Sequence, residues 1–507
     1  MSGTVADALT WWARSKPNLV AVDFDGDAVS YRELDTWADG VAADIHAAGV
    51  APGDRISIVG ANSLEWCVAA LAGFKVGAIV APFNQRMVAP ELAVLVGDCE
   101  PKIVFCDEST RARIDEVHAA NPGFTVRSLE GDVRPLRHSA HPPIRSRAAD
   151  LAEPTAIVYT SGTTGTPKGV IFTHGTIAGE MHEWHLLEPI ESNGLRQLMV
   201  LPLFSAAGLI WGICRVILHG GTLLLQPRFD PGHALEVLTT QHVTTFVGPP
   251  ILFEQIAAQP GFVDAELSSI TTSHVGGARV PVELVKKWHA KGVVLRQIYG
   301  QTEIGGSATA MPHDEALLRP EQCGWGGIFT KVRVVDENDE DVPAGTRGQI
   351  LLRGPGMMPG YWCNEQATKA ALKGGWLHTG DIGVLDERGY LTFVDRQKDM
   401  IISGGLNIAP MEIEIVLQEM PGVEEVAVIS VPDPKFGETP AALIYTDTTI
   451  SAGDVVAWCN QRLADYKVPR YVVFTDAPLP RMASGKIAKR ELRATYADIP
   501  ETHPKVR

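Results

Sequence analysis

The chain has 507 residues, of which 45% are apolar and 21% are charged, and its formal net charge is −16. This length exceeds what a single hydrophobic core normally supports, so two or more domains are expected. The negative charge argues against a general surface for nucleic acid or anionic membranes, and any anionic ligand must therefore be held by local positive groups.

The cysteines and the start of the chain bear on the cellular compartment. The 7 cysteines are scattered without a C-x-x-C pair, so neither a zinc site nor a disulfide framework is indicated, and a reducing cytoplasm fits. No basic segment followed by an apolar core opens the chain, and no apolar run reaches the roughly 18 residues of a transmembrane helix. We therefore expect a cytoplasmic protein without a signal peptide or an integral membrane segment.

Strand and helix signals alternate in the first part of the chain. The strand-like and helix-like runs are 55–59, 64–74, 78–80 and 102–106. This alternation predicts a largely parallel sheet with helices on its faces. Residues 20–31 differ, because two apolar runs flank Asp25-Gly26, which is typical of a β-hairpin.

The composition changes in three later segments. Residues 128–153 are rich in Pro, Arg, His and Ser, and we expect a mobile connector there. Residues 322–395 contain many glycines and short strand-like runs, which predict a small barrel-like subdomain. A polar hinge-like point at 395–399 precedes roughly a hundred residues of mixed signals, as expected for a small second domain. The predicted domains are 1–397 and 398–507.

Residues 159–170 combine hydroxyls, glycines and one lysine directly after the apolar run 156–158. Glycines let successive backbone N–H groups point at one anion, and hydroxyls and Lys168 add donors and positive charge. A polyphosphate is the natural ligand; a polar surface turn is the alternative. The loop is not a Walker A motif, because Gly169 follows the lysine. The predicted phosphate contacts are Thr160, Ser161, Gly162, Thr163, Thr164 and Lys168.

Five further motifs follow in order along the chain. They are Gly276-Gly277-Ala278, Tyr299-Gly300-Gln301-Thr302-Glu303, His378-Thr379-Gly380-Asp381, residues 395–407 and residues 480–490. With the phosphate loop they resemble the adenylate-forming superfamily of acyl-CoA synthetases, amino-acid adenylation domains and luciferases, and most of all an acyl-CoA or aryl-CoA ligase. The resemblance covers nearly the whole chain. It implies an α/β fold with a large N-terminal domain of parallel α/β sheets, a small β-barrel-like subdomain and a small mobile α+β C-terminal domain.

The segment after the strand-like run 293–298 carries groups suited to a nucleotide at a switch point of the sheet. Tyr299 can stack on a purine, and Thr302 can donate to the α-phosphate. Glu303 would face phosphates, which makes sense only with Mg²⁺ between them. The alternatives are core packing for the tyrosine and a solvated charge for the glutamate. The resemblance assigns these residues the nucleotide and metal roles, and adds Gly277, Ala278 and Gly300 to the nucleotide site.

Three residues of the later motifs complete the nucleotide chemistry. Asp381 has the reach to accept from both ribose hydroxyls, and Arg396 is expected to support it. Lys486 can bridge the acid's carboxylate and the phosphate during attack. Alone, these residues would be a turn cap, a surface salt bridge and an exposed lysine.

The resemblance implies two half-reactions at one site. The carboxylate first attacks the α-phosphorus of ATP and pyrophosphate leaves, with Mg²⁺, Lys486 and loop donors neutralising charge. The acyl-adenylate then meets a thiol after the small domain rotates about the hinge residue Lys398, which brings Gly404 and Gly405 to a thiol tunnel.

Coenzyme A is the preferred thiol. Lys435, Phe436 and Tyr466, together with Lys467, fall where related ligases hold the nucleotide of coenzyme A. The match is weaker here, because Val468 stands where some relatives carry arginine. An ordinary surface loop is the alternative.

Small side chains border the acyl pocket that the resemblance implies. The pocket residues are Phe204, Ser205, Ala207, Gly208, Gly248, Gly276 and Gly305. Small residues leave volume, so a bulky cyclic acid is preferred over a long straight chain, with tight backbone packing as the other explanation of the glycines. An amino acid is disfavoured, because no Asp stands in the 204–205 segment. Ser205 and Leu406 depart from the gating aromatic or histidine and the glutamate common in relatives.

The sequence therefore predicts an ATP-dependent carboxylic acid–CoA ligase acting through an acyl-adenylate. The alternatives are an enzyme that loads a separate carrier protein, a long-chain fatty acid–CoA ligase, and a nucleotide-binding regulatory protein without turnover. The last is disfavoured by the joint presence of Lys168, Glu303, Asp381 and Lys486. The expected partners are a small carboxylic acid, ATP and coenzyme A, without nucleic acid, and a homodimer stays open. Residues 182–185 read H-E-x-H, which lacks the spacing of a zinc helix.

Overall fold

The computed structural model describes residues 3–139, 141–144, 149–160, 167–190, 194–278, 280–403, 406–463, 465–482 and 485–507. Its internal contacts divide the chain into two compact units. The first unit comprises residues 1–332 and 352–378, and the second comprises residues 333–351 and 379–507. The predicted boundary between residues 397 and 398 stays a prediction.

Two mixed sheets form the centre of the first unit. In the described part of the chain, one sheet has the order β13-β12-β11-β9-β10-β1-β2 and the other the order β6-β5-β3-β4-β7-β8. The strands of the first sheet are β1 Val20–Phe24, β2 Asp27–Ser30, β9 Arg196–Met199, β10 Thr222–Leu225, β11 Thr245–Gly248, β12 Thr272–Gly276 and β13 Arg296–Ile298. Those of the second are β3 Arg55–Val59, β4 Ile79–Val80, β5 Ile103–Cys106, β6 Thr125–Ser128, β7 Pro154–Thr160 and β8 Lys168–Thr173.

The pairing of these strands confirms the predicted parallel α/β architecture. Neighbours pair in parallel except β1 with β2 and β7 with β8. The hairpin predicted at 20–31 is also confirmed. Its turn residues Asp25 and Gly26 both have positive φ, 53° and 89°, which is the backbone of the turns that match the twist of a hairpin.

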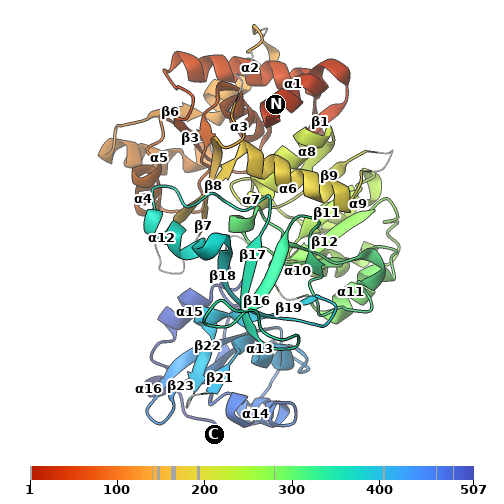
Figure 1. Cartoon of the computed structure of the whole chain (residues 1–507), viewed down its shortest axis with the longest axis vertical. Coiled ribbons are helices and arrows are strands. Elements are labelled where there is room, and N and C mark those ends of the chain that lie inside the picture. The colour runs from red at the N-terminus through yellow and green to blue at the C-terminus, as the bar shows by residue number, and fades with distance from the viewer. Residues whose placement is uncertain are drawn as a thin grey trace. The chain divides into compact units, whose positions relative to one another are not determined.

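Helices cover these sheets (Figure 1). They are α1 Val5–Ser15, α2 Tyr31–Ala47, α3 Leu64–Val76, α4 Ala89–Cys99, α5 Glu108–Ala120, α6 His174–Leu187, α7 Ala206–Gly208, α8 Arg215–His219, α9 Pro231–Thr240, α10 Pro250–Ala257, α11 Val282–His289 and α12 Glu365–Ala371. Shorter turns are η1 Leu129–Val133, η2 Arg134–His138, η3 Leu209–Cys214, η4 Pro260–Phe262, η5 Thr302–Ile304, η6 His313–Glu315 and η7 Lys373–Gly375. A two-stranded sheet of β14 Thr309–Ala310 and β15 Trp325–Gly326 completes the unit.

Helix α3 illustrates how the local sequence sets an element. The Ser63 hydroxyl accepts from the backbone N–H of Trp66 at the start, and Gly77 with φ of 77° ends the helix. Apart from Glu65 and Lys75 its residues are apolar on all sides, and nearly all of them are buried, as expected of a helix enclosed by other elements. The buried ammonium of Lys75 is neutralised by Asp35 and Asp39 of α2, at 2.6 and 2.5 Å.

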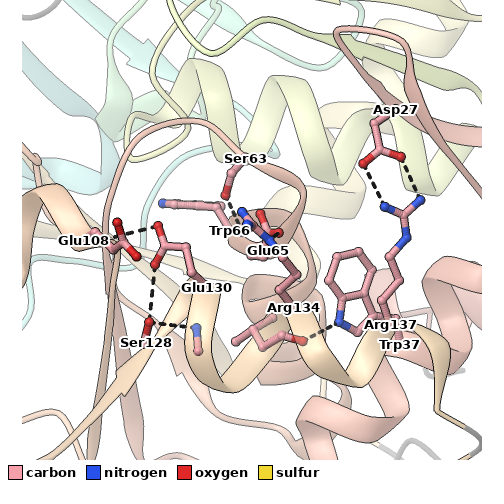
Figure 2. A network of polar contacts seen from close by, with 12 residues as sticks. Asp27, Trp37, Ser63, Glu65, Trp66, Glu108, Ser128, Glu130, Arg134 and Arg137 are labelled. Atoms are coloured by element: carbon pink, nitrogen blue, oxygen red, sulfur yellow. Dashed lines mark hydrogen bonds and ion pairs between the residues drawn. The ribbon is translucent and has the colours of Figure 1, made fainter.

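The segment 128–138, expected to be part of a mobile connector, is instead folded onto the first unit. Arg137 makes two hydrogen bonds to Asp27, of 2.8 and 2.9 Å, and Arg134 donates to Glu65 over 2.6 Å. Figure 2 shows both arginines pointing to their carboxylates and the Trp37 indole donating to the carbonyl of Val133, over 2.8 Å. The connector prediction is wrong for these residues, because their arginines meet carboxylates that are distant in sequence.

The second unit has an α+β fold, as predicted. It contains most of a sheet in the order β16-β17-β18-β19, and a sheet in the order β21-β20-β23-β22 with β24 paired to β23. The strands are β16 Lys331–Val335, β17 Gly348–Arg353, β18 Leu377–Leu385, β19 Leu391–Arg396, β20 Ile401–Ser403, β21 Leu406–Ile408, β22 Glu425–Asp433, β23 Gly437–Tyr445 and β24 Tyr471–Thr475. The helices are η8 Gln397–Asp399, α13 Pro410–Gln418, α14 Ala452–Asn460, η9 Asp465–Lys467, α15 Lys489–Thr495 and α16 Ile499–Thr502.

Strand β22 is buried on both faces, and its residues alternate between two cores. Val426 and Val428 pack in one core, whereas Ala427 and Ile429 pack in the other. Successive residues of a strand point to opposite faces, so this apolar run serves both layers. Within the described ranges, no helix is both long and apolar enough to cross a membrane.

Candidate active site

The predicted pocket and nucleotide-binding segments of the first unit lie at the carboxyl ends of four neighbouring parallel strands. β13, β12, β11 and β9 are adjacent in the sheet. The last residues of these strands and the segments that follow them include the predicted residues Tyr299–Gly305, Gly276–Ala278, Gly248 and Phe204–Gly208. In open α/β sheets the carboxyl edge is where ligands bind, so the fold brings these segments to the expected place.

The two ends of the phosphate loop lie side by side. Thr160 at the end of β7 pairs with Lys168 at the start of β8 in antiparallel register. Both side chains are partly exposed. The predicted contacts Ser161, Gly162, Thr163 and Thr164 lie outside the described residues. The pairing sets Lys168 beside Thr160, and an ammonium next to a hydroxyl is suited to an anion.

Glu303 lies in η5 and is held by a segment far along the chain. The phenolic O–H of Tyr361 donates to its Oε1 over 3.0 Å, and the backbone N–H of Met358 donates to its carbonyl over 2.9 Å. Burial and the nearby Glu303 raise the pKa of Tyr361, so the phenol stays a donor. The Nζ of Lys168 lies 5.1 Å from the centroid of the same tyrosine ring. Tyr361 therefore stands between the predicted metal ligand and the predicted phosphate lysine.

Thr302 and Tyr299 differ in accessibility. Thr302 is partly exposed at the start of η5, where a ligand can reach its hydroxyl. Tyr299 is only 7% exposed, and its backbone N–H donates to the Thr309 hydroxyl over 2.9 Å. Most of the ring is covered by protein, as in the core-packing alternative, so the role of Tyr299 at a purine stays a prediction.

The pocket glycines mark close packing. A Cβ at Gly208 would collide with the Pro202 carbonyl, and one at Gly276 would lie 2.5 Å from the Ile298 carbonyl oxygen. A Cβ at Gly305 would lie 3.1 Å from both the Glu180 carboxyl carbon and the Gly356 backbone. This is the tight packing that the sequence left open as the other explanation, and these glycines therefore do not by themselves argue for a large acyl volume.

Ser205 has a local structural task. Its hydroxyl donates to the Pro202 carbonyl over 2.8 Å and accepts from the N–H of Gly208 over 3.1 Å, which caps α7. Phe204 and Ala207 on either side are partly exposed. The serine that departs from the relatives' gating residue thus shapes the turn between β9 and α7.

Helix α6 carries two buried carboxylates in opposite situations. Glu183 accepts from the N–H of Thr330 over 2.8 Å and from its hydroxyl over 2.6 Å, and also from the N–H of Phe329. Glu180 is 1% exposed, and neither of its oxygens has a hydrogen-bond partner of normal geometry. Burial, followed by the charge of Glu183, raises the pKa of Glu180 well above its usual value, although the N–H of Ser307 and the Trp184 indole oppose the shift. Glu183 of the H-E-x-H segment is therefore engaged with the backbone.

Asp381, Arg396 and Lys486 lie in one electrostatic neighbourhood of the second unit. Asp381 on β18 pairs in register with Arg396 on β19, and the Arg396 Nε lies 3.6 Å from the Asp381 Oδ1. Burial and the charge of Arg396 lower the pKa of Lys486 to about 8, against the opposing effect of Asp381. The structure thus brings together the predicted ribose ligand, its supporting arginine and the predicted catalytic lysine.

Two of the predicted coenzyme A residues, Lys435 and Phe436, lie together with Arg470 on the same unit. Asp433 accepts from the backbone N–H groups of Lys435 and Phe436, over 2.8 and 3.0 Å. The Phe436 ring has the Lys435 ammonium 5.1 Å from its centroid and the Arg470 guanidinium 4.3 Å from it. Tyr466 is 39% exposed. Arg470 was not predicted, and it places an arginine near the position where Val468 departs from relatives.

The predicted hinge and tunnel residues are described only in part. Lys398 lies in η8, directly after β19. Gly404 and Gly405 lie outside the described residues, and Leu406 begins β21. The roles of these residues stay predictions.

The sequence interpretation missed Tyr361, Arg470 and Glu180. Tyr361 follows Gly360 in the β-rich stretch, where its spacing to the motifs carried no chemical signal. Glu180 shares a helix face with the apolar residues Ile177, Met181 and Trp184, and this spacing was the available sign for it, since buried carboxylates are rare. Arg470 had only its proximity in sequence to Tyr466 and Lys467.

Comparison with known proteins identifies the class. Residues 9–362 match the AMP-binding enzyme family, and residues 412–486 match the AMP-binding enzyme C-terminal domain. The chain is 36% identical to the feruloyl-CoA synthase of Amycolatopsis sp over 490 residues, which cover 96% of this chain and 97% of that one. It is 35% identical to the long-chain-fatty-acid–CoA ligase FadD13 of Mycobacterium tuberculosis over 485 residues, 93% of this chain and 94% of that one.

A solved structure agrees with this result. The O-succinylbenzoate coenzyme A synthetase (MenE) of Bacillus subtilis, in complex with ATP and magnesium ion, superposes with a TM-score of 0.87 at 27% identity, covering 96% of this chain and 99% of that one. The chain belongs to the AMP-binding enzyme family, the adenylate-forming superfamily that its motifs resemble. It is an enzyme, an acid–thiol ligase of the AMP-forming type.

Proposed function

We propose that the chain is an ATP-dependent carboxylic acid–coenzyme A ligase that acts through an acyl-adenylate on a bulky hydrophobic cyclic acid. The main observation in support of ATP binding is the arrangement around Tyr361. Its hydroxyl donates to the Glu303 carboxylate, and the Lys168 ammonium lies over its ring. A fixed carboxylate and an ammonium at the end of a hydroxyl-rich loop are what a metal-bound triphosphate requires.

The first half-reaction needs charge neutralisation more than covalent chemistry. A carboxylate oxygen of the acid attacks the α-phosphorus of ATP, the bond to the bridging oxygen breaks, and that oxygen leaves with pyrophosphate. Lys168 and the Thr160 hydroxyl act on the phosphates from the loop, and Thr302 donates from η5. Lys486 is the proposed cation for the attacking carboxylate and the phosphate, and Asp381 is the proposed acceptor of the ribose hydroxyls with the support of Arg396.

The residues present fit a magnesium ion that arrives with ATP. Among the described residues, no group of three or more His, Cys, Asp or Glu side chains forms a metal cage. Glu303 instead offers a partly exposed carboxylate. Mg²⁺ is commonly held by one or two carboxylates plus substrate phosphates, so Glu303 suits it. When bound, the ion neutralises phosphate charge.

The second half-reaction transfers the acyl group to a thiol. The thiolate sulfur attacks the acyl carbon, a thioester forms, and AMP leaves with the bridging oxygen. Lys435 and Arg470 supply positive charge for the phosphates of coenzyme A, and Phe436 and Tyr466 supply rings for its adenine. Lys398 as the hinge and Gly404 and Gly405 as the tunnel complete this part of the proposal.

The cyclic acid is supported by the likeness to a feruloyl-CoA synthase and by the partly exposed Phe204 and Ala207 at the sheet edge. The likeness to a long-chain-fatty-acid–CoA ligase favours a straight-chain acid as the second candidate. The glycines do not separate the two, because they pack against protein atoms.

A panel of acids tests the proposal. The chain would be incubated with MgATP and each of aromatic, polycyclic, long-chain and short aliphatic acids, and acid-dependent exchange of pyrophosphate into ATP would report adenylation. Addition of coenzyme A and mass spectrometry would report the thioester, with Lys486→Ala as the control for adventitious activity. Exchange without an acyl-CoA product would redirect the proposal to a carrier-protein acceptor, and preference for long-chain acids would replace the cyclic substrate.

A further inference from the structure

The segment Gly360–Trp362 is fixed to strand β8, the strand that starts with the phosphate lysine. The N–H of Trp362 donates to the Gly169 carbonyl over 2.7 Å, and the N–H of Ile171 donates to the Gly360 carbonyl over 3.2 Å. Tyr361 itself forms an antiparallel bridge with Val170. The backbone of Tyr361 is thus set by the end of the phosphate loop.

Helix α12 holds the same residue from the other direction. The N–H of Tyr361 donates to the Thr368 hydroxyl over 2.9 Å, and that hydroxyl donates to the Asn364 carbonyl over 2.8 Å. The side chain of Tyr361 therefore extends from a backbone that is fixed on two sides. This limits the positions that its hydroxyl can take.

The side chain then reaches Glu303 on a third element. Its hydroxyl donates to Oε1 over 3.0 Å, while Met358, three residues earlier, donates to the Glu303 carbonyl over 2.9 Å. The segment 358–361 thereby grips both the backbone and the carboxylate of Glu303. A hydrogen bond to an ionised acceptor is roughly twice as strong as one between neutral groups.

We propose that Tyr361 is a positioning residue that fixes the carboxylate of Glu303 for the magnesium ion of MgATP. This inference rests on the proposed function of Glu303 as the metal ligand. The phenol donates to Oε1 of the carboxylate and so limits the orientations that the carboxylate can take. It also makes the position of Glu303 depend on β8, so that the metal ligand and the phosphate lysine share one support.

Loss of the hydroxyl has a defined cost in this arrangement. Tyr361→Phe keeps the ring beside Lys168 and removes only the donor to Glu303. Hydrogen bonds to charged groups contribute more free energy than those between neutral groups. We therefore expect the dissociation constant for MgATP and the half-saturating Mg²⁺ concentration to rise about tenfold. Lys168 keeps its ring contact, so phosphate attraction by that residue is unchanged.

The test compares wild type, Tyr361→Phe, Glu303→Gln and the double variant in the full chain. MgATP affinity would be measured by calorimetry over a series of Mg²⁺ concentrations, and pyrophosphate exchange would be measured in parallel. Tyr31→Phe is the matched control, since its buried hydroxyl donates to the Gly221 carbonyl over 2.9 Å, outside the site. Thermal unfolding of each variant reports the fold.

The double variant distinguishes positioning from a general packing effect. If Tyr361 acts through Glu303, adding Tyr361→Phe to Glu303→Gln changes Mg²⁺ dependence by less than about twofold, because coupled residues are not additive. An unchanged Mg²⁺ dependence in Tyr361→Phe, or an equal loss in both backgrounds, overturns the inference. MgATP binding without exchange on any acid contradicts the proposed function while still testing Tyr361, and absence of MgATP binding by the wild type overturns both.

Discussion

The loop that carries Glu303 and the turn that carries Lys486 hold their functional groups in different ways. Glu303 is fixed by Met358 and Tyr361, which lie more than fifty residues away in sequence. Lys486 lies in a turn closed by its own neighbours: the N–H of Met482 donates to its carbonyl over 2.7 Å, and that of Gly485 to the Met482 carbonyl over 2.9 Å.

The difference follows from what each group has to do. A metal-ligating carboxylate works only in a narrow geometry, so distant elements must agree on its place. A lysine acts as a point charge on a flexible stem, and a locally closed turn is sufficient to present it. The burial and the neighbouring Arg396 that lower the pKa of Lys486 show that its electrostatic setting is nevertheless tertiary.

Removing the lysine should have the largest effect. In Lys486→Ala we expect adenylation to fall about a hundredfold to a thousandfold, as for loss of one transition-state charge partner. Transfer to coenzyme A from supplied acyl-adenylate should be spared. Pyrophosphate exchange and thioester formation would be measured separately, with circular dichroism as the control for folding. Equal loss of both half-reactions in a folded variant would contradict the assignment.

The metal ligand should show a smaller, ion-dependent loss. Glu303→Gln keeps the shape and removes the charge, so we expect pyrophosphate exchange to fall about tenfold to a hundredfold and to recover partly at high Mg²⁺. Titration of Mg²⁺ at fixed ATP checks this. If the variant has the Mg²⁺ dependence of the wild type, Glu303 does not bind the ion and the contrast with Lys486 disappears.

The charge of Lys486 predicts a pH effect. Its pKa of about 8 means that the ammonium is present below that pH and is lost as the pH rises through it. Adenylation by the wild type should therefore decline above pH 8, by about tenfold per unit once most lysine is neutral. Lys486→Arg stays charged and should lose this decline, whatever its absolute rate. Identical pH profiles of the two proteins would remove Lys486 from the titrating step.

Substitution of Glu180 should have the smallest effect, which is a change in thermal stability. It tests the packing next to the loop that carries Glu303. Its pKa is raised, so its contribution to stability is full below the usual carboxyl pKa and is lost as the pH rises through the raised value. Glu180→Gln should therefore unfold at a higher temperature than the wild type at pH 8, with a smaller difference at pH 5.

The expected gain in stability of Glu180→Gln is limited by the cost of burying a polar group without a partner, and Glu183 provides the control variant. A buried polar group without a partner costs about 1–3 kcal/mol, which bounds the gain. Glu183→Gln removes a carboxylate with three donors and should destabilise the protein at both pH values. A Glu180→Gln variant that is less stable than the wild type at pH 8 would mean that the carboxylate is ionised and satisfied.

The sequence was most informative where function is carried by short motifs. Residues 159–170 and the Tyr299–Glu303 motif predicted the phosphate loop and its partner at the edge of the sheet, and the strand ends lie where they were expected. It was least informative where one residue type serves two purposes. Gly208 and Gly276 suggested space, and the structure shows close approach to carbonyl groups. Ser205 suggested an altered gate, and its hydroxyl caps a helix.

The sequence by itself determined the class of enzyme through the resemblance of its motifs to a known family. It also determined the parallel α/β fold and the hairpin at 20–31, because these depend on local spacing and apolar periodicity. Only the tertiary structure decided that Tyr361 reaches Glu303, that Arg470 lies over Phe436, and that 128–138 is anchored by Arg134 and Arg137. The physical reason is that these contacts join residues whose separation along the chain carries no periodicity. A hydrogen bond or ion pair across such distances exists only after the core has brought its two elements together.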